Sequence, residues 1–283
     1  MKEPAVTKIA VLLAVKNGAG KLAGTLDSLH NQTLAPQQHV VYVYDDGSTD
    51  QTPQLLEAAA RAGKCVVVGR NPVSIGLTKT LNLLIQQTRS DYIARVDCGD
   101  LCAPERLEHQ LRYLEEHAEV AAVCSSVRLF IPPRDFVGPI FEPLGTELSV
   151  AQLRFKNPVV HGSVMLRRDV FTSVGLYDEN CRFAQDLDLW LRILNTGKRM
   201  HWMKEALYFL EVDPQGISAQ NATRQAEISN EIRETLFDHY QPTDRKMNLA
   251  RMCRLARLRR LPLVGRPFKL MESLLYEIRC RVA

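Results

Sequence analysis

Short apolar runs alternate with amphipathic stretches over the first half of the chain. Continuous apolar runs of strand length cover residues 8–15, 39–44, 65–68, 92–96 and 120–127. Between them, leucine and isoleucine recur at helical spacing, which predicts helices from residue 22, over about 53–62, over 80–88 and from 104 to 117. Strands that alternate with helices favour right-handed crossovers and a parallel sheet. The pattern predicts an α/β fold with a mainly parallel sheet flanked by helices.

Two of these predicted strands end in acidic residues. The run 39–44 leads into the acidic loop 45–50, and the run 92–96 leads into a turn that contains Asp97 and Asp100. Open α/β sheets bind their ligands at the carboxyl ends of the strands, and carboxylates there suit a hard divalent cation with the phosphates it carries. A solvated loop that only caps the next helix has the same local composition. The acidic turns alone therefore leave both interpretations open.

Composition places the chain among ordinary globular proteins. It has 283 residues, of which 46% are apolar and 24% charged, so one large α/β domain with an appendage is expected. The N-terminus shows no basic-then-apolar signal segment, and no apolar run reaches the roughly 18 residues of a spanning helix. We therefore expect a cytoplasmic protein. The seven cysteines are scattered, which favours reduced thiols over a disulfide framework or a zinc site.

The C-terminal part differs from the rest in charge. We predict a boundary near residue 220, with a domain over 1–220 and a helical extension over 221–283. Residues 244–283 carry eleven Lys or Arg against three Asp or Glu, and an apolar stripe at three-four spacing follows residues 268–282. Such a basic amphipathic helix favours an anionic membrane surface, although the stripe could also pack on the catalytic part or on the second subunit of a homodimer. Nucleic acid is not an expected partner, because the tail lacks a recognisable reader motif.

Four segments, in this order along the chain, resemble the inverting family-two glycosyltransferases, which are nucleotide-sugar enzymes of the GT-A fold. The loop 45–50 is similar to that family's nucleotide-recognition loop, and residues 92–107 are similar to its metal-site strand and following helix. Residues 157–165 and 184–192 are similar to its acceptor-side segments. The likeness runs from about residue 8 to residue 220. It implies a Rossmann-like, mixed but mainly parallel sheet flanked by helices.

The resemblance also implies a nucleotide site at one edge of the sheet. Asp46 is expected to hydrogen-bond the base, with Asp45 shaping the loop. Lys79 and Arg95 are candidate partners of the diphosphate or sugar, and a structural ion pair is the alternative for each. The nucleotide-binding candidates are Ala14, Val15, Asn17, Asp45, Asp46, Lys79, Arg95 and Asp97.

A divalent cation, Mn²⁺ or Mg²⁺, is implied at the turn 97–100. The family usually carries Asp-x-Asp there, but the second of these positions is Gly99 in this chain. Asp97 and Asp100 remain as candidate ligands. Asp213 stands where many relatives carry a histidine that joins the metal site, and we expect Asp213 to compensate for Gly99.

Inverting transfer needs a base for the acceptor hydroxyl, and Asp186 is the candidate. It matches the family's catalytic carboxylate, although the glutamate that usually precedes it is Gln185 here. Asp186 could instead cap the helix that follows it, with Asp188 as the alternative base. Asp188 and His161 are the acceptor-side candidates, and His161 would otherwise be a hydrogen-bonded core histidine.

The sequence therefore predicts an inverting glycosyltransferase that moves a sugar from a nucleotide donor to a hydroxyl of a glycan or lipid-linked acceptor. We expect a UDP-sugar donor, and a role in cell-surface polysaccharide or glycoconjugate synthesis at the cytoplasmic face of the membrane. Two other classes stay open. One is a non-catalytic nucleotide-sugar-binding protein. The other is a sugar nucleotidyltransferase, whose Gly-rich triphosphate loop is weakly similar to residues 16–21.

Overall fold

A mixed β-sheet is the centre of the part of the chain that the structure describes. This computed structural model describes residues 7–131, 135–136, 145–155, 157–181, 183–212, 225 and 227–232. Within them, strands pair in the order β3-β2-β1-β4-β8-β6-β9-β5, and β7 pairs with β6. The strands are β1 (Thr7–Val15), β2 (His39–Asp45), β3 (Val66–Arg70), β4 (Ser90–Arg95), β5 (Leu101–Cys102), β6 (Val120–Ile131), β7 (Asp135–Phe136), β8 (Met165–Arg167) and β9 (Arg199–Glu211).

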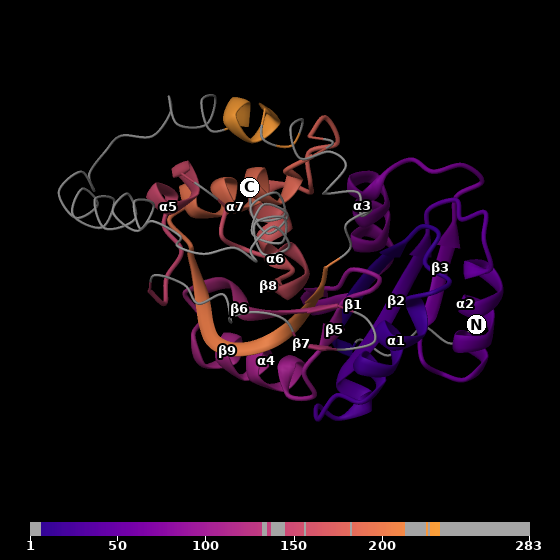
Figure 1. Cartoon of the computed structure of the whole chain (residues 1–283). Helices are drawn as coiled ribbons and strands as arrows, with labels where there is room; N and C mark the ends of the chain where they lie inside the picture. Colours follow the sequence, from indigo (N-terminus) through magenta and orange to yellow (C-terminus); the bar gives the residue numbers. More distant parts are fainter. Residues whose placement is uncertain are drawn as a thin grey trace, which may run out of the picture.

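Helices cover both faces of this sheet (Figure 1). Buried side chains of α1, α2 and α4 belong to one hydrophobic core, and those of α3, α6 and α7 belong to a second core. The α-helices are α1 (Leu22–His30), α2 (Thr52–Arg61), α3 (Leu77–Gln87), α4 (Arg106–Glu116), α5 (Val150–Phe155), α6 (Asp169–Val174) and α7 (Gln185–Asn195). Two 3₁₀ turns, η1 (Pro36–Gln38) and η2 (His161–Ser163), precede β2 and β8.

Strand β1 is buried on both faces, as its continuous apolar run predicts. Ile9, Val11 and Leu13 belong to the core under α1 and α4, while Ala10 and Leu12 belong to the core under α3 and α7. β1 pairs in parallel with β2 on one side and with β4 on the other. The predicted parallel arrangement is therefore confirmed for these strands, and the loops that follow them leave the sheet at the same edge.

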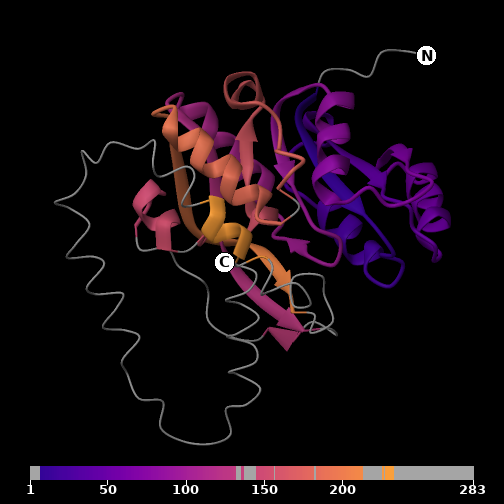
Figure 2. The same cartoon turned by 90° about the horizontal axis from the view of Figure 1, so that it is seen from above.

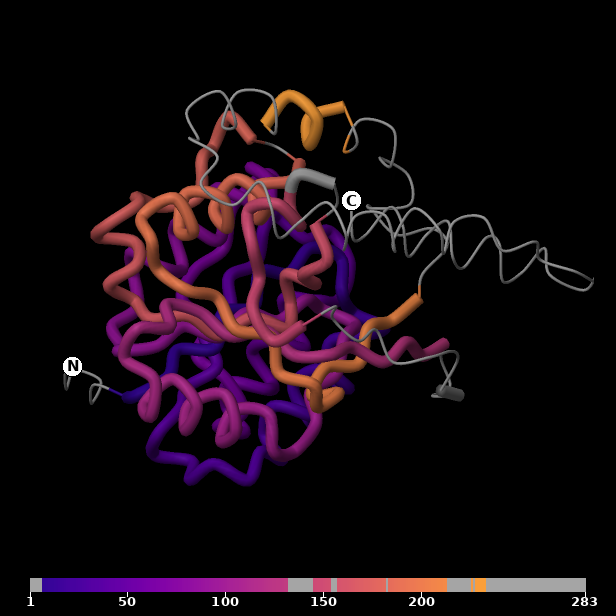
Figure 3. Tube along the Cα trace, turned by 90° about the vertical axis from the view of Figure 1, so that its left-hand side faces the viewer, coloured from indigo at the N-terminus to yellow at the C-terminus, as the bar shows by residue number. Residues whose placement is uncertain are grey.

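The second half of the sheet is mixed in direction. Strand β8 is antiparallel to both β4 and β6, whereas the long strand β9 runs parallel to β6. Figures 2 and 3 show the ends of β6 and β9 projecting side by side, in agreement with the pairing of Phe130 with Glu211. The last part of β9 also pairs with β5, directly after the acidic turn 97–100. The sequence pattern did not predict β9, which brings residues 208–211 beside that turn.

Several element boundaries differ from the prediction. Helix α3 begins at Leu77 rather than at residue 80, directly after Gly76, whose φ of +95° suits glycine. Strand β6 continues to Ile131 instead of ending at residue 127. The apolar pattern thus located these elements correctly but placed their ends only approximately.

Some predictions concern residues outside those described. Asp213 is one of them, and of the predicted extension 221–283 the structure describes only residues 225 and 227–232. The boundary near residue 220 and the membrane contact of the basic tail therefore stay predictions. Among the described residues, no helix combines the length and the apolar character needed to cross a membrane.

Candidate active site

Three loops meet at the carboxyl edge of the parallel strands β1, β2 and β4. The backbone N–H of Asp46 donates to the carbonyl of Val15 at 2.8 Å, and that of Val96 donates to the carbonyl of Leu12 at 3.1 Å. Because β1 lies between β2 and β4, the acidic loop 45–50 and the acidic turn 97–100 lie at one edge of the sheet. This is the edge at which open α/β sheets bind ligands.

Hydrogen bonds join the loop after β1 to the loop after β2. The N–H of Asn17 donates to Oγ of Ser48 at 2.9 Å, and the N–H of Thr49 donates to Oδ1 of Asn17 at 2.8 Å. Asn17 has a φ of +51°, a left-handed conformation in which asparagine is enriched. Ala14 and Val15 end β1, where Val15 is buried and Ala14 half-buried, whereas Asn17 is exposed. These hydrogen bonds hold the two loops together beside the sheet edge.

The carboxylate of Asp46 is fully engaged by the segment 71–76. Its Oδ1 accepts hydrogen bonds from Nδ2 of Asn71 and the N–H of Ile75, both at 2.8 Å. Its Oδ2 accepts from Oγ of Ser74 at 2.7 Å and from the N–H of Gly76 at 3.0 Å. Burial raises the pKa of Asp46, but these four bonds outweigh it and hold the pKa below its usual value. The predicted bond from Asp46 to a nucleobase would require one of them to open.

Asp45 has a different environment. Its Oδ1 accepts from the N–H of Ser48 at 2.9 Å. Its buried Oδ2 lies 3.1 Å from Nε of Arg70 as an ion pair, yet within the described structure it accepts no well-aligned hydrogen bond. Arg70 also donates from Nη2 to the carbonyl of Ser48 at 2.8 Å. Asp45 therefore retains an acceptor, with a cationic neighbour beside it.

The turn after β4 begins with an ion pair. Nη1 of Arg95 contacts Oδ2 of Asp97, and the Arg95 side chain is 6% exposed whereas that of Asp97 is 43% exposed. The N–H of Asp97 donates to the hydroxyl of Tyr208 at 3.2 Å. Asp97 thus projects from the sheet edge toward solvent while its backbone is attached to β9.

Asp100, by contrast, points into the protein. It is 2% exposed, Oδ2 accepts from the Tyr208 hydroxyl at 2.7 Å, and Oδ1 accepts from the N–H of Glu211 at 2.8 Å. Both oxygens therefore hold β9 against the turn. That Asp100 is a metal ligand stays a prediction, and its burial leaves Asp97 as the more accessible carboxylate of the turn.

Arg106 is a buried arginine that links the strands next to the turn. It is fully buried, and its Nη2 donates to the carbonyls of Arg95 at 3.0 Å and of Val164 at 3.3 Å. Its guanidinium also lies 5.0 Å from the centre of the Tyr208 ring, a cation–π distance. Arg106 thereby ties β4, the segment before β8 and β9 together beneath the site.

Glu211 is the last residue of β9 and reaches the turn from the other side. It is 7% exposed, and its Oε1 lies 3.0 Å from Nζ of Lys21, the residue before α1. A Cβ atom added to Gly99 would collide with Oε2 of Glu211. The carboxylate of Glu211 therefore occupies the space into which a side chain at position 99 would extend.

Asp186 lies in the first turn of α7. The helix begins at Gln185 after Ala184, which has a φ of +60°, uncommon for a residue other than glycine. Asp186 is 9% exposed, and Nδ2 of Asn157 donates to its Oδ2 at 2.7 Å. Ala184 stands at the N-cap position of the helix, and the Asp186 carboxylate accepts a hydrogen bond from the N–H of Leu187 in the first turn.

Arg95 connects the two sides of the site electrostatically. Burial raises the pKa of Asp186, while the bonds from Leu187 and Asn157 and the charge of Arg95 act in the opposite direction. The same guanidinium is paired with Asp97, and its Nε is buried without a hydrogen-bond partner in the described structure. Arg95 therefore lies within electrostatic reach of both acidic groups.

The remaining acceptor-side candidates are engaged with their neighbours. Nε2 of His161 lies 2.8 Å from the hydroxyl of Tyr177, and burial together with Arg95 holds the pKa of His161 well below its usual value. Asp188 accepts from Nη2 of Arg192 at 2.6 Å and from Nε at 2.9 Å. His161 is thus a buried, hydrogen-bonded histidine, and Asp188 forms an ion pair along α7.

Comparison with known proteins decides the family. The family model described as "Glycosyl transferase family 2" matches residues 10–175, more than half of the chain. The chain belongs to glycosyl transferase family 2. The amylovoran biosynthesis glycosyltransferase AmsE of Erwinia amylovora is 31% identical over 190 residues, which cover 67% of this chain and 70% of AmsE. The predicted family and the assignment as a glycosyltransferase are therefore confirmed.

Solved structures confirm the GT-A fold for this family 2 chain. The mannosyltransferase PcManGT from Pyrobaculum calidifontis, in complex with GDP-Man and Mn²⁺, superposes with a TM-score of 0.64 at 17% identity, covering 98% of this chain and 87% of that one. S. aureus TarS 1–349, in complex with UDP-GlcNAc, gives a TM-score of 0.61 at 16% identity, covering 97% and 89%. At such identities the likeness concerns the fold alone.

The sequence predicts a divalent cation, and the side chains near the acidic turn of this family 2 chain show which residues could bind it. Within the described residues, no three or more His, Cys, Asp or Glu side chains are grouped to hold a metal. One or two carboxylates suffice, however, where the cation also binds substrate phosphates. Asp97 is exposed enough to serve, and the space beside Gly99 holds a second carboxylate, that of Glu211. Carboxylate oxygens of this kind are the donors that a hard divalent cation prefers.

Several residues of the family 2 site were not identified from the sequence. They are Lys21, Arg70, Arg106, Asn157, Tyr208 and Glu211. Lys79, which the sequence did single out, is exposed on α3.

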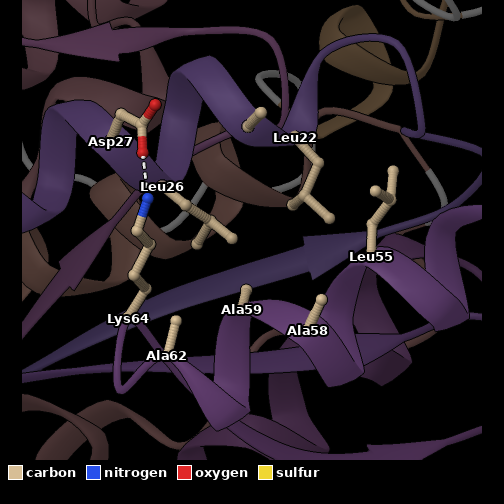
Figure 4. A pocket seen from close by; sticks show the side chains of 9 residues that line it. Leu22, Leu26, Asp27, Leu55, Ala58, Ala59, Ala62 and Lys64 are labelled. Atoms are coloured by element: carbon tan, nitrogen blue, oxygen red, sulfur yellow. Dashed lines mark hydrogen bonds and ion pairs between the residues drawn. The ribbon is translucent and has the colours of Figure 1, made fainter.

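A separate pocket of about 260 Å³ lies between α1 and α2, and the ion pair of Lys64 with Asp27 lies at one end of it (Figure 4). Its lining is mainly apolar and includes none of the predicted site residues.

Proposed function

We propose that this chain is an inverting glycosyltransferase whose catalytic base is Asp186. The observation that carries the proposal is the position of Asp186, a buried carboxylate with a raised pKa that shares the guanidinium of Arg95 with the donor-side residue Asp97. A carboxylate with a raised pKa is a better proton acceptor than an exposed aspartate, and burial keeps water from competing for it.

The reaction is a single in-line displacement at the anomeric carbon of the donor sugar. The acceptor hydroxyl oxygen forms a bond to that carbon while the bond from the carbon to the diphosphate oxygen breaks. The hydroxyl proton passes to Asp186, and the bonding electrons leave with the nucleoside diphosphate. Attack from the face opposite the leaving group inverts the configuration of the sugar. Asn157 orients the carboxylate through its 2.7 Å hydrogen bond.

The donor is assigned to the sheet edge formed by β1, β2 and β4. We assign the nucleobase to the surface formed by Ala14, Val15 and Asn17. Oδ2 of Asp45 would accept a hydrogen bond from an N–H of the nucleobase, and Arg70 lies beside it. This exchanges the roles that the sequence suggested for Asp45 and Asp46, because Asp46 already accepts four hydrogen bonds. The UDP-GlcNAc complex of the structurally similar TarS makes a UDP-sugar the first donor to test.

The leaving diphosphate needs positive charge near the acidic turn. The Mn²⁺ complex of PcManGT supports a divalent cation, Mn²⁺ or Mg²⁺, with Asp97 as one ligand. When bound, such a cation neutralises the charge that develops on the departing phosphates. Arg95, which pairs with Asp97 in this structure, would then be able to face the diphosphate or the sugar.

The acceptor is assigned as a hydroxyl of a glycan or a lipid-linked sugar in cell-surface polysaccharide or glycoconjugate synthesis. The name of the relative AmsE, which refers to amylovoran biosynthesis, supports this class. The basic segment 244–283 supports a location at the cytoplasmic face of an anionic membrane. His161 and Asp188 remain the acceptor-side candidates, and a homodimer formed through the apolar stripe remains an alternative use of the tail.

The test is release of nucleoside diphosphate from a panel of nucleotide sugars with Mn²⁺ or Mg²⁺ and a membrane lipid extract as acceptor. Release is expected to require both the extract and Asp186, so D186N should lose it. D169N is the matched control, because Asp169 is an exposed aspartate on the neighbouring helix α6. The anomeric configuration of the product, read by NMR, should be opposite to that of the donor.

Two outcomes would overturn the proposal. Donor binding without release from any sugar would indicate a non-catalytic nucleotide-sugar-binding protein. Release of pyrophosphate from a nucleoside triphosphate and a sugar phosphate would indicate a nucleotidyltransferase.

A further inference from the structure

The turn 97–100 has a backbone that excludes the second carboxylate of an Asp-x-Asp sequence. Gly99 has a φ of +108°, a conformation that residues with a Cβ atom rarely adopt. The turn is also bound to α1, because the N–H of Gly99 donates to Oγ1 of Thr25 at 2.9 Å and this hydroxyl donates to the carbonyl of Asp100 at 3.0 Å. An aspartate at position 99 would therefore strain the turn and collide with Glu211.

Glu211 is held in this space by its own backbone and by its side chain. Its N–H donates to Oδ1 of Asp100, and Oε1 is paired with Nζ of Lys21. Two residues earlier in β9, Phe209 pairs with Leu101 of β5, which sets the register of the strand against the turn. Glu211 is thus supplied by a strand that pairs with the turn, and its carboxylate takes the place of a side chain that the turn itself cannot carry.

The charge of this carboxylate is balanced by a cation. The Lys21 side chain is 37% exposed while that of Glu211 is 9% exposed, so the ammonium group covers the carboxylate on its solvent side. Burying a carboxylate is costly unless a cation stays close to it. In this structure Lys21 is that cation. The ammonium of Lys21 is a monovalent neighbour that a divalent ion can displace, because both compete for the same oxygens.

We propose that Glu211 is the second carboxylate ligand of the divalent cation, in place of the residue missing at position 99. Asp97 supplies the other ligand, and Lys21 pairs with Glu211 in the absence of the cation. This inference rests on the proposed function, because the cation is the one that serves the diphosphate. It replaces the expectation that Asp213 compensates for Gly99 and gives Asp100 a structural role.

The test is direct binding of Mn²⁺, measured as loss of the free Mn²⁺ signal in electron paramagnetic resonance, with the full chain and with or without UDP. E211Q preserves the shape of the side chain and is expected to weaken Mn²⁺ binding by at least about tenfold, the effect that even outer partners of metal ligands can produce. D97N should weaken it similarly. K21M should strengthen it, because it removes the competing cation and leaves Glu211 intact.

Matched controls separate a ligand from a structural residue. E115Q alters an exposed glutamate that is also paired with a lysine, Lys8, and should leave Mn²⁺ binding unchanged. D213A should likewise leave it unchanged. Thermal unfolding identifies any variant that has lost its fold, and K21M then tests the proposal without changing Glu211.

The inference is overturned if E211Q binds Mn²⁺ as tightly as the native chain, or if K21M weakens binding. It is also overturned if the native chain releases nucleoside diphosphate without binding Mn²⁺. That result would leave the transferase function in place and make Lys21 and Arg95 the groups that face the diphosphate. Mn²⁺ binding through Glu211 with no release from any donor would contradict the proposed function instead.

Discussion

Asn157 and Asp186 form a buried pair in which Nδ2 of the amide donates a 2.7 Å hydrogen bond to Oδ2 of the carboxylate. They come from the segment before η2 and from the first turn of α7. Burial raises the pKa of Asp186, and the bond from Asn157 opposes that rise because it stabilises the ionised form. Asn157 thus helps to set the pH at which the proposed base becomes available.

N157A should move the acidic limb of the pH profile of kcat/KM to higher pH. The base must be ionised to accept a proton, and loss of the hydrogen bond raises the pKa of Asp186 further. Initial rates over a series of pH values would measure the shift, with N195A as control at the exposed end of the same helix. An unchanged limb together with a lower rate at every pH would show that Asn157 acts only on packing.

D186N and D188N should separate the two candidate bases. D186N is expected to lower kcat by about 10²–10⁴-fold, the range typical of a lost general base, while UDP binding is retained. D188N should keep the pH profile but lower the free energy of unfolding by about 1–3 kcal/mol, because it breaks the buried part of the pair with Arg192. Turnover measurements and urea unfolding give the two quantities. The reverse pattern would make Asp188 the base.

D45N and D46N should differ in what they disturb. D45N replaces one oxygen of a buried carboxylate by an NH₂ group and removes the charge beside Arg70, so it should weaken UDP binding, measured by calorimetry. D46N should mainly lower stability, because the amide cannot accept all four hydrogen bonds of the segment 71–76. Equal loss of UDP affinity without loss of stability in D46N would support the role first predicted for Asp46.

The lowered pKa of Asp46 predicts that the effect of D46N on stability depends on pH. A carboxylate whose folded pKa lies below its unfolded value, about 3.9 for aspartate, stabilises the fold above the unfolded pKa. This contribution is lost as the pH falls through the folded pKa. The stability difference between the native chain and D46N should therefore be largest near neutral pH and shrink on acidification. A difference that stays constant into strong acid would contradict the assignment of the four bonds to the ionised carboxylate.

The sequence predicts best those features that depend on residues close together in the chain. The apolar runs of β1, β2 and β4 and the acidic residues that follow them are contiguous patterns, and they predict both the strands and the sheet edge at which Asp45 and Asp97 lie. The resemblance added Asp186, which no periodicity distinguishes from a helix-capping aspartate. These predictions depend on neighbours within a few residues of each other.

Contacts between distant segments could not be read in the same way. Glu211 reaches Gly99 only because β9 pairs with β5, and the strand was not predicted. Asp45 and Asp46 are adjacent and chemically identical, so only the folding of the segment 71–76 onto Asp46 distinguishes them. The residues missed at the site are those whose partners lie far away in the sequence.

Y208F should lower the free energy of unfolding by more than a Tyr→Phe substitution at an exposed position would. The Tyr208 hydroxyl is buried, donates to Asp100 and accepts from the N–H of Asp97, so its removal takes away one hydrogen bond to a buried carboxylate and one from a backbone N–H. We expect a loss of about 1–3 kcal/mol in the free energy of unfolding, measured in urea. Y113F, which changes a partly exposed tyrosine of α4, is the control. Equal stability of the two variants would show that these bonds contribute little.

Arg95 is the residue whose substitution should affect both halves of the reaction. R95M removes the cation that pairs with Asp97 and that lowers the pKa of Asp186, so the KM for the donor should rise and the acidic limb of kcat/KM should move to higher pH. R95K retains the charge and should largely restore the limb, although its single ammonium cannot reproduce the geometry of the guanidinium. N157A provides the comparison, because it should move the limb and leave the donor KM unchanged. If R95M changed only the donor KM, Arg95 would belong to the donor site alone, and Asp186 would be tuned by burial and Asn157 without it.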